Sequence, residues 1–147
     1  MAIDRTAHAT WEGDLRGGSG RYDLTSSGAI SGGEVTFASR FEPEAGGRTS
    51  PEELVAAAHA TCFSMALANG LAQDGHAPTR LETDAKVTLD NSGGGFAISK
   101  IHLTVRGEVD GVDEAAFKKA AEQARVNCPI SKALSAVPEI SLDASLA

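Results

Sequence analysis

Aromatic residues and cysteines are scarce in this chain of 147 residues, which holds five Phe, one Tyr, one Trp and two Cys. Two cysteines are too few for a disulfide scaffold, and so few aromatic residues predict a core built mainly from Ala, Val, Leu and Ile. Basic residues are also outnumbered, 13 against 20 acidic ones, so the net charge is −7. That charge argues against binding nucleic acid and against docking on an anionic membrane.

An apolar segment near the start is also missing, so we expect no secretion signal and predict a cytoplasmic protein. The segment from Leu54 to Leu71 has no charged residue over 18 positions, which approaches the length of a membrane span. Three polar residues, His59, Ser64 and Asn69, interrupt this segment, and acidic residues flank it. We therefore predict a buried helix in a soluble protein.

Glycine-rich turns divide the first 49 residues into segments that favour strands, at residues 7–12, 21–25 and 34–41. A long helix then begins at Ser50, where Ser50, Pro51 and Glu53 form a helix start, and it runs to Asp74, with Gly75 as its stop. The remaining predicted elements are strands at 83–89 and 96–109, helices at 112–125 and 129–136, and a strand at 140–146. This order predicts a single α+β domain with a mostly antiparallel sheet.

The predicted long helix has no charged residue on any side after its first turn. A helix that is apolar all round is buried all round. A small domain can hardly enclose such a helix alone, so we expect a second subunit to cover it.

The two cysteines occupy different settings. Cys128 directly precedes Pro129 at a predicted helix start, where exposed amides and the helix dipole favour a thiolate. Cys62 lies in the middle of the long helix and needs a cation from elsewhere in the fold to become reactive. The residues alone leave open reactive thiols, inert small apolar side chains and a single disulfide.

Arg40 and Arg48 are the candidate cations for Cys62, and Glu52 could hold an arginine through a bidentate pair. Glu52 precedes Cys62 by ten residues, which is about 15 Å of helical rise. One arginine can hardly touch both residues along a straight helix. Either the helix start bends, or the arginine and the glutamate reach Cys62 from a different chain.

Metal binding is the rival use of these residues. His59 and Cys62 lie three positions apart on one helical face, and Cys128 could add a third zinc ligand. Structural zinc sites need four ligands, usually with close cysteine pairs, and the chain has no Cys-x-x-Cys. We therefore expect no metal and interpret His59 as a polar neighbour inside a helix interface.

Two segments surround the cysteines: residues 49–67, TSPEELVAAAHATCFSMAL, and residues 127–134, NCPISKAL. Both resemble the OsmC/Ohr family, the osmotically inducible and organic hydroperoxide resistance proteins. Two N-terminal segments, residues 11–14 and 37–42, resemble the OsmC branch of that family. The likeness covers nearly the whole chain and includes both cysteines at a family-like spacing.

The resemblance implies a single OsmC-like α+β domain over residues 1–147, with mostly antiparallel sheets wrapped around a long buried central helix, in an intertwined homodimer. It implies a thiol-dependent peroxidase without a cofactor. By position, Cys62 matches the peroxidatic cysteine, Cys128 the resolving cysteine, Glu52 the catalytic glutamate and Arg40 the active-site arginine.

In the implied reaction, the Cys62 thiolate attacks an organic hydroperoxide, and the resulting sulfenic acid condenses with Cys128 to a disulfide. A dithiol reductant, either a lipoyl-bearing protein or a small dithiol, then reopens that bond. Organic peroxides should be preferred to hydrogen peroxide because Phe63 and Met65 can line an apolar pocket.

Two further expectations concern the dimer. At least one of Arg40 and Glu52 should act on Cys62 across the interface. The alternative function is a non-catalytic stress protein that binds a small apolar ligand in the interface pocket.

Overall fold

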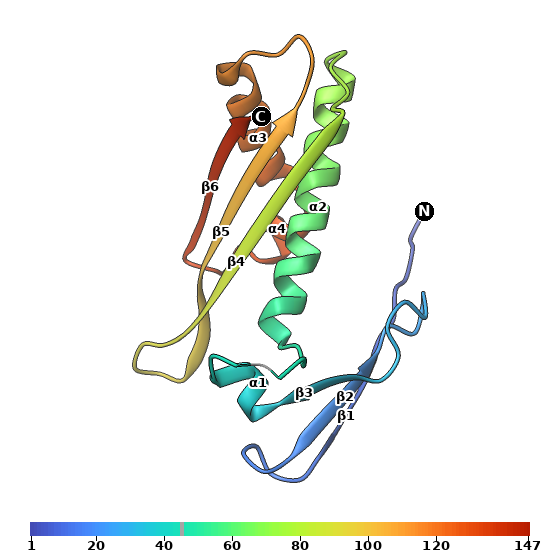
Figure 1. Cartoon of the computed structure of the whole chain (residues 1–147), viewed down its shortest axis with the longest axis vertical. Helices are drawn as coiled ribbons and strands as arrows, with labels where there is room; N and C mark the ends of the chain where they lie inside the picture. The colour runs from blue at the N-terminus through green and yellow to red at the C-terminus, as the bar shows by residue number, and fades with distance from the viewer. Residues whose placement is uncertain (45) are drawn as a thin grey trace. The chain divides into compact units, whose positions relative to one another are not determined.

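The computed structural model describes residues 1–44 and 46–147 (Figure 1). Residue 45, within the predicted loop at 42–49, lies outside the described residues. The chain divides into two compact units, Met1–Leu54 and Val55–Ala147. A single domain over residues 1–147 stays a prediction.

The first unit contains a three-stranded antiparallel sheet of β1 (His8–Glu12), β2 (Ser19–Asp23) and β3 (Gly33–Thr36), in that order. Glycines on the sheet make room for its large aromatic rings. A Cβ added to Gly20 would lie only 2.8 Å from the Trp11 ring, and a Cβ added to Gly33 would overlap the ring of Tyr22. The predicted strands at 7–12 and 21–25 are confirmed here, with their ends shifted by at most two residues.

The predicted strand at 34–41 is wrong in its second half, because β3 ends at Thr36 and α1 (Phe37–Phe41) follows. The Thr36 hydroxyl accepts a hydrogen bond from the Ser39 N–H at 3.1 Å, and the Ser39 hydroxyl accepts one from the Thr36 N–H at 2.9 Å. This capping box satisfies amides at the helix start and favours a helical turn over a longer strand. Arg40 therefore lies in the last turn of a helix.

The second unit packs helices against a three-stranded sheet. The sheet has the order β4-β5-β6, with β4 (Arg80–Asn91) antiparallel to β5 (Phe96–Glu108) and β6 (Glu139–Leu146) parallel to β5. The helices are α2 (Pro51–Gln73), which begins at the end of the first unit, α3 (Glu114–Asn127) and α4 (Pro129–Ala133). Each corresponds to a predicted element. Three of the four strand pairings among the described residues are antiparallel, as predicted.

The core of the second unit lies where α2 and α3 meet the sheet (Figure 1). The predicted alternation on β5 is confirmed, since Ile101, Leu103 and Val105 are fully buried. Their neighbours in the core come from α2 and α3 and include Phe63, Leu67, Leu71, Phe117, Ala121 and Ala124.

α2 begins as predicted, with the Ser50 hydroxyl accepting a hydrogen bond from the Glu53 N–H at 3.1 Å. By length and composition alone α2 could cross a membrane, with a mean hydropathy of 1.4, but the core helix of a soluble protein passes the same test. One side of α2 does pack in the core, through Phe63 and Leu67. The single chain leaves much of α2 uncovered, as expected for a helix that it cannot enclose alone: only 22% of the apolar 18-residue window is buried, and Met65 is 69% exposed.

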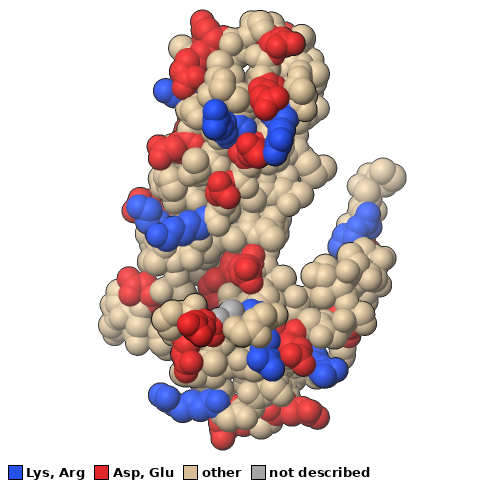
Figure 2. All heavy atoms as spheres, in the orientation of Figure 1, with Lys and Arg blue, Asp and Glu red and all other residues tan. Residues whose placement is uncertain are grey.

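Acidic and basic side chains are interspersed on the face of the molecule that Figure 2 shows. On β4 and β5, charged residues alternate with less exposed ones. Lys100 and Glu139, which are register partners on β5 and β6, form an ion pair of 2.6 Å. This face of the sheet is therefore a solvated surface with balanced charge.

We predict that Gly107→Ala destabilises the second unit by about 1–3 kcal/mol, as expected for overpacking a filled core. A Cβ at Gly107 would lie 2.6 Å from the buried Phe117 ring and 3.2 Å from Leu81. Urea unfolding measures the change. Gly94→Ala is the control, because its added Cβ meets nothing within 4 Å; equal stability of the two variants would contradict the prediction.

Candidate active site

The two cysteines lie 66 positions apart in sequence and meet in the second unit. Both are free thiols, with Cys62 half-buried on α2 and Cys128 fully buried. The Cys128 thiol donates a hydrogen bond to the Cys62 sulfur at an S···S distance of 3.0 Å. The sulfur atoms are thus placed for direct chemistry between them.

Cys128 is held at a rigid corner between two helices. Its N–H donates to the Ala124 carbonyl at the end of α3, and its carbonyl accepts from the Lys132 N–H in α4. Its φ of −55° and ψ of 125° are the extended conformation that a following proline enforces. Pro129 also suits the first position of α4, where no N–H is needed. The backbone of Cys128 is therefore hydrogen-bonded to both helices.

Burial raises the pKa of the Cys62 thiol above its ordinary value, and the neighbouring Cys128 thiol raises that pKa further. The backbone N–H of Ile130, in the first turn of α4, hydrogen-bonds the Cys62 sulfur and lowers its pKa. No cation among the described residues contributes to the shift of the Cys62 pKa. A reactive Cys62 thiolate therefore needs a positive charge that its surroundings in this unit do not supply, as the sequence predicts.

Arg40 and Glu52 form a bidentate pair in the first unit. The Arg40 Nη2 lies 2.7 Å from Glu52 Oε1, and its Nε lies 3.2 Å from both carboxylate oxygens. The Glu52 side chain is only 11% exposed and that of Arg40 33%, so the pair is sheltered from water. Arg48 instead pairs with Glu34 at the exposed surface, 3.2 Å away. Of the two candidate arginines, Arg40 is the partner of Glu52.

A mainly apolar pocket of about 480 Å³ lies beside Arg40 in the first unit. Its lining combines aromatic and aliphatic side chains with the arginine and includes Trp11, Leu15, Val35, Phe37, Phe41 and Pro51. The pocket expected from Phe63 and Met65 is wrong for the single chain. Phe63 is buried in the core, whereas Met65 is 69% exposed and lies two positions further along the helix. Two positions turn a helix by about 200°, so these side chains point in different directions.

His59 is fully buried one helical turn before Cys62. Its Nε2 lies 2.7 Å from the Ser131 Oγ, while Nδ1 has no hydrogen-bond partner among the described residues. Burial lowers the pKa of His59 below its ordinary value, so the ring is neutral near pH 7. The interpretation of His59 as a polar neighbour inside a helix interface is confirmed. No group of three or more potential metal ligands is found in the described part of the chain.

Sequence reasoning missed the Ser131 partner. The signal was present in matching spacings, since His59 stands three residues before Cys62 and Ser131 three residues after Cys128. Residues three apart on a helix lie on one side of it. Two segments that meet at their cysteines therefore also meet at His59 and Ser131.

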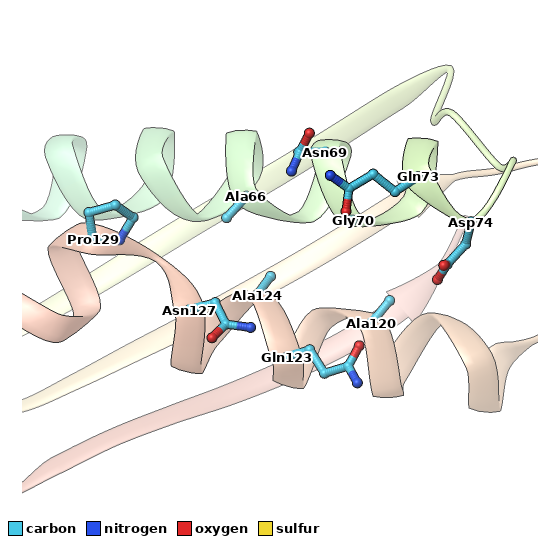
Figure 3. Close-up of a pocket in the computed structure, with 10 residues that line it drawn as sticks. All are labelled: Ala66, Asn69, Gly70, Gln73, Asp74, Ala120, Gln123, Ala124, Asn127 and Pro129. Atoms are coloured by element: carbon cyan, nitrogen blue, oxygen red, sulfur yellow. The ribbon is translucent and has the colours of Figure 1, made fainter. Parts of the chain in front are cut away.

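A groove of about 430 Å³ runs between α2 and α3 (Figure 3). Small residues of the two helices face each other across it, and carboxamide side chains line it, namely Asn69, Gln73, Gln123 and Asn127. Pro129 lies at one end of the groove and Asp74 at the other. The groove therefore reaches the corner that holds Cys128.

The four predicted site residues thus form two pairs. Cys62 and Cys128 contact each other in the second unit, whereas Arg40 and Glu52 are bonded in the first unit.

Comparison with known proteins shows the family of the chain. Residues 44–143 match the family model described as OsmC-like protein. The chain is 44% identical over 146 residues to Peroxiredoxin OsmC of Escherichia coli (strain K12), covering 99% of both chains. It is 31% identical to the organic hydroperoxide resistance protein of Xanthomonas axonopodis pv. citri, covering 87% of this chain and 85% of that protein. The crystal structure of an organic hydroperoxide resistance protein from Elizabethkingia anophelis has a TM-score of 0.75 and 25% identity, with all of both chains covered. The chain therefore belongs to the OsmC family, in its OsmC branch.

Proposed function

We propose that this chain is a thiol-dependent peroxidase that reduces organic hydroperoxides, and hydrogen peroxide less well. The observation that carries the proposal is the 3.0 Å contact between the Cys62 and Cys128 sulfur atoms. It occurs in a chain that is 44% identical over nearly its whole length to a relative named a peroxiredoxin. Cys62 is the peroxidatic cysteine and Cys128 the resolving cysteine.

In the first step, the Cys62 thiolate attacks the outer oxygen of the hydroperoxide. A sulfur–oxygen bond forms, the oxygen–oxygen bond breaks, and the alkoxide leaves and takes up a proton. Arg40 stabilises the thiolate and the charge that develops on the leaving oxygen. Glu52 holds the guanidinium in one orientation through its bidentate contact. The product is the Cys62 sulfenic acid and an alcohol.

In the second step, the Cys128 sulfur attacks the Cys62 sulfenic acid. The sulfur–sulfur bond forms, and the hydroxyl of the sulfenic acid leaves with the thiol proton as water. A disulfide needs about 2.05 Å between its sulfur atoms, so each sulfur moves by only about half an ångström from the present contact. A dithiol such as a lipoyl-bearing protein then returns both cysteines to thiols by exchange and is itself oxidised to a disulfide.

The protein acts as a homodimer in this proposal. The support is the uncovered side of α2, where exposed positions recur at helical spacing at Ala58, Thr61, Met65 and Asn69. These side chains are apolar or uncharged, and a second copy of the same helix is the partner that such a surface fits. The intertwining that the family resemblance implies remains part of this proposal.

Arg40 and Glu52 act on Cys62 from the second copy. Since the two residues are bonded to each other within one chain, they act together. Glu52 stands ten residues from Cys62 on the same helix, a rise of about 15 Å. That distance is too long for one arginine to bridge, which supports a site built from two chains.

The apolar pocket beside Arg40 accounts for the preference for organic peroxides. Its aromatic and aliphatic lining can cover the carbon chain of a hydroperoxide while the guanidinium faces the peroxide group. Hydrogen peroxide lacks that carbon chain and gains nothing from this burial.

Peroxide consumption with a lipoyl-type dithiol tests the function. Wild type should consume tert-butyl hydroperoxide faster than hydrogen peroxide, Cys62→Ser should be inactive, and Cys128→Ser should stall and over-oxidise. An inactive wild type with free thiols would contradict the proposal. Binding of a small apolar ligand that survives in Cys62→Ser would then favour the non-catalytic stress protein.

The pH dependence of Cys62 reactivity tests the role of Arg40. Loss of a nearby cation leaves the pKa raised by burial, so less thiolate forms at neutral pH. In a Cys128→Ser background, Arg40→Gln should slow alkylation of Cys62 about ten- to a hundredfold at pH 7, with the rate recovering as pH rises. The control is Arg48→Gln, since Arg48 pairs with Glu34 at the surface. Identical pH profiles for the two variants would refute the role.

A further inference from the structure

His59 is a buried titratable side chain that the proposed reaction does not use. Its imidazole is fully buried, and its hydrogen bond to Ser131 spans 2.7 Å. Ser131 is itself only 8% exposed. The bond joins the middle of α2 to α4, which is the same pair of segments that carries the two cysteines. A buried polar bond of this kind is costly to break, because each group then loses both its partner and water.

The segment Cys128–Ser131 touches α2 through three polar contacts. The Cys128 thiol and the Ile130 N–H both reach the Cys62 sulfur, and Ser131 bonds to His59. The first two contacts involve the sulfur atom that gains and loses an oxygen atom during the reaction. The contact between His59 and Ser131 involves neither sulfur atom.

The short helix α4 needs such an anchor. It has only five residues, and a helix of that length has little stability of its own. Cys128 must nevertheless meet the sulfenic acid of Cys62 before a second peroxide molecule does. Otherwise Cys62 is oxidised to a sulfinic acid, which is not recovered by thiols.

We propose that the His59–Ser131 hydrogen bond is a positioning pair that holds the Cys128–Ser131 segment against α2, so that disulfide formation outpaces over-oxidation of Cys62. The proposal rests on the proposed function. Neither side chain touches the reacting atoms: the sulfur–sulfur bond forms while the S–O bond of Cys62 and the S–H bond of Cys128 break, and water leaves. Both residues act through the placement of Cys128.

The chain offers a matched control in the Ser64–Thr83 hydrogen bond. That bond also spans 2.7 Å, starts two residues from Cys62 and is partly buried. It ties α2 to β4 and makes no contact with α4. Removing it should loosen α2 locally without releasing Cys128.

The double variant His59→Leu/Ser131→Ala removes the pair without leaving either partner buried and unsatisfied. After one equivalent of tert-butyl hydroperoxide, the rate of sulfenic acid formation should match wild type. The following disulfide formation should slow about tenfold, as followed by sulfenic acid trapping. With several equivalents of the peroxide, sulfinic acid should accumulate at Cys62, as followed by intact mass. In His59→Gln, the terminal amide nitrogen can occupy the position of Nε2. This variant should therefore keep the wild-type ratio of disulfide to sulfinic acid. Ser64→Ala should resemble wild type.

A second readout does not depend on peroxide turnover. In a glutathione redox buffer, the fraction of Cys62–Cys128 disulfide reports how well the fold holds the two thiols together. Loss of the pair should shift the dithiol–disulfide equilibrium about tenfold toward the dithiol, which corresponds to about 30 mV. This shift should appear even if the protein turned out not to be a peroxidase, so the two proposals fail separately.

A folded double variant with the wild-type equilibrium and the wild-type sulfinic acid yield would overturn the positioning role. An effect of Ser64→Ala as large as that of the double variant would overturn it as well, because general loosening of α2 would then be the cause.

Discussion

The contact between the Cys62 and Cys128 sulfur atoms is the constraint on which the rest of the second unit depends. For this contact, Cys128 at the corner between α3 and α4 must lie beside the turn of α2 that carries Cys62. The core serves this purpose, since Phe63 and Leu67 of α2 pack with Phe117 and neighbouring alanines of α3. Small residues on both helices let the backbones approach, and the proline after Cys128 holds the corner extended.

Electrostatics then decide what this contact can do. A half-buried thiol next to another thiol holds its proton more tightly than a free cysteine, and one backbone amide from α4 only partly opposes this. The arginine whose bidentate partner is a sheltered glutamate lies on the other unit. In the proposed dimer the reactive thiolate therefore exists only where two chains meet, which couples chemistry to assembly.

Much of the fold could be predicted from the sequence because its signals are local. The Ser50-Pro51 start of α2, the alternation on β5 and the amphipathic pattern of α3 each follow from nearby residues. The prediction of a strand over residues 34–41 was wrong in its second half. The residue pattern there favoured a strand, whereas the Thr36–Ser39 capping box stabilises a helical turn.

The site was less predictable than the fold. The cysteines could be singled out from the sequence, but their contact depends on packing between segments far apart in the chain. The same holds for the His59–Ser131 bond, which depends on packing between distant segments. It also holds for the choice of Arg40 over Arg48 as the partner of Glu52. The hydrophobic pattern of α2 indicates that the helix can be buried, but it does not say which chain covers it.

In the proposed dimer, Arg40 of one copy activates Cys62 of the other, and mixed dimers test this activation across the interface. Cys62→Ser and Arg40→Gln are each expected to have little activity. When the two variants are unfolded together and reassociated, each hybrid dimer should contain one site with both native residues. We predict roughly a quarter of the wild-type activity in the mixture, the value for random association of a two-fold symmetric dimer. A mixture no more active than the average of its two parents would contradict activation across the interface, because Arg40 would then act within its own chain.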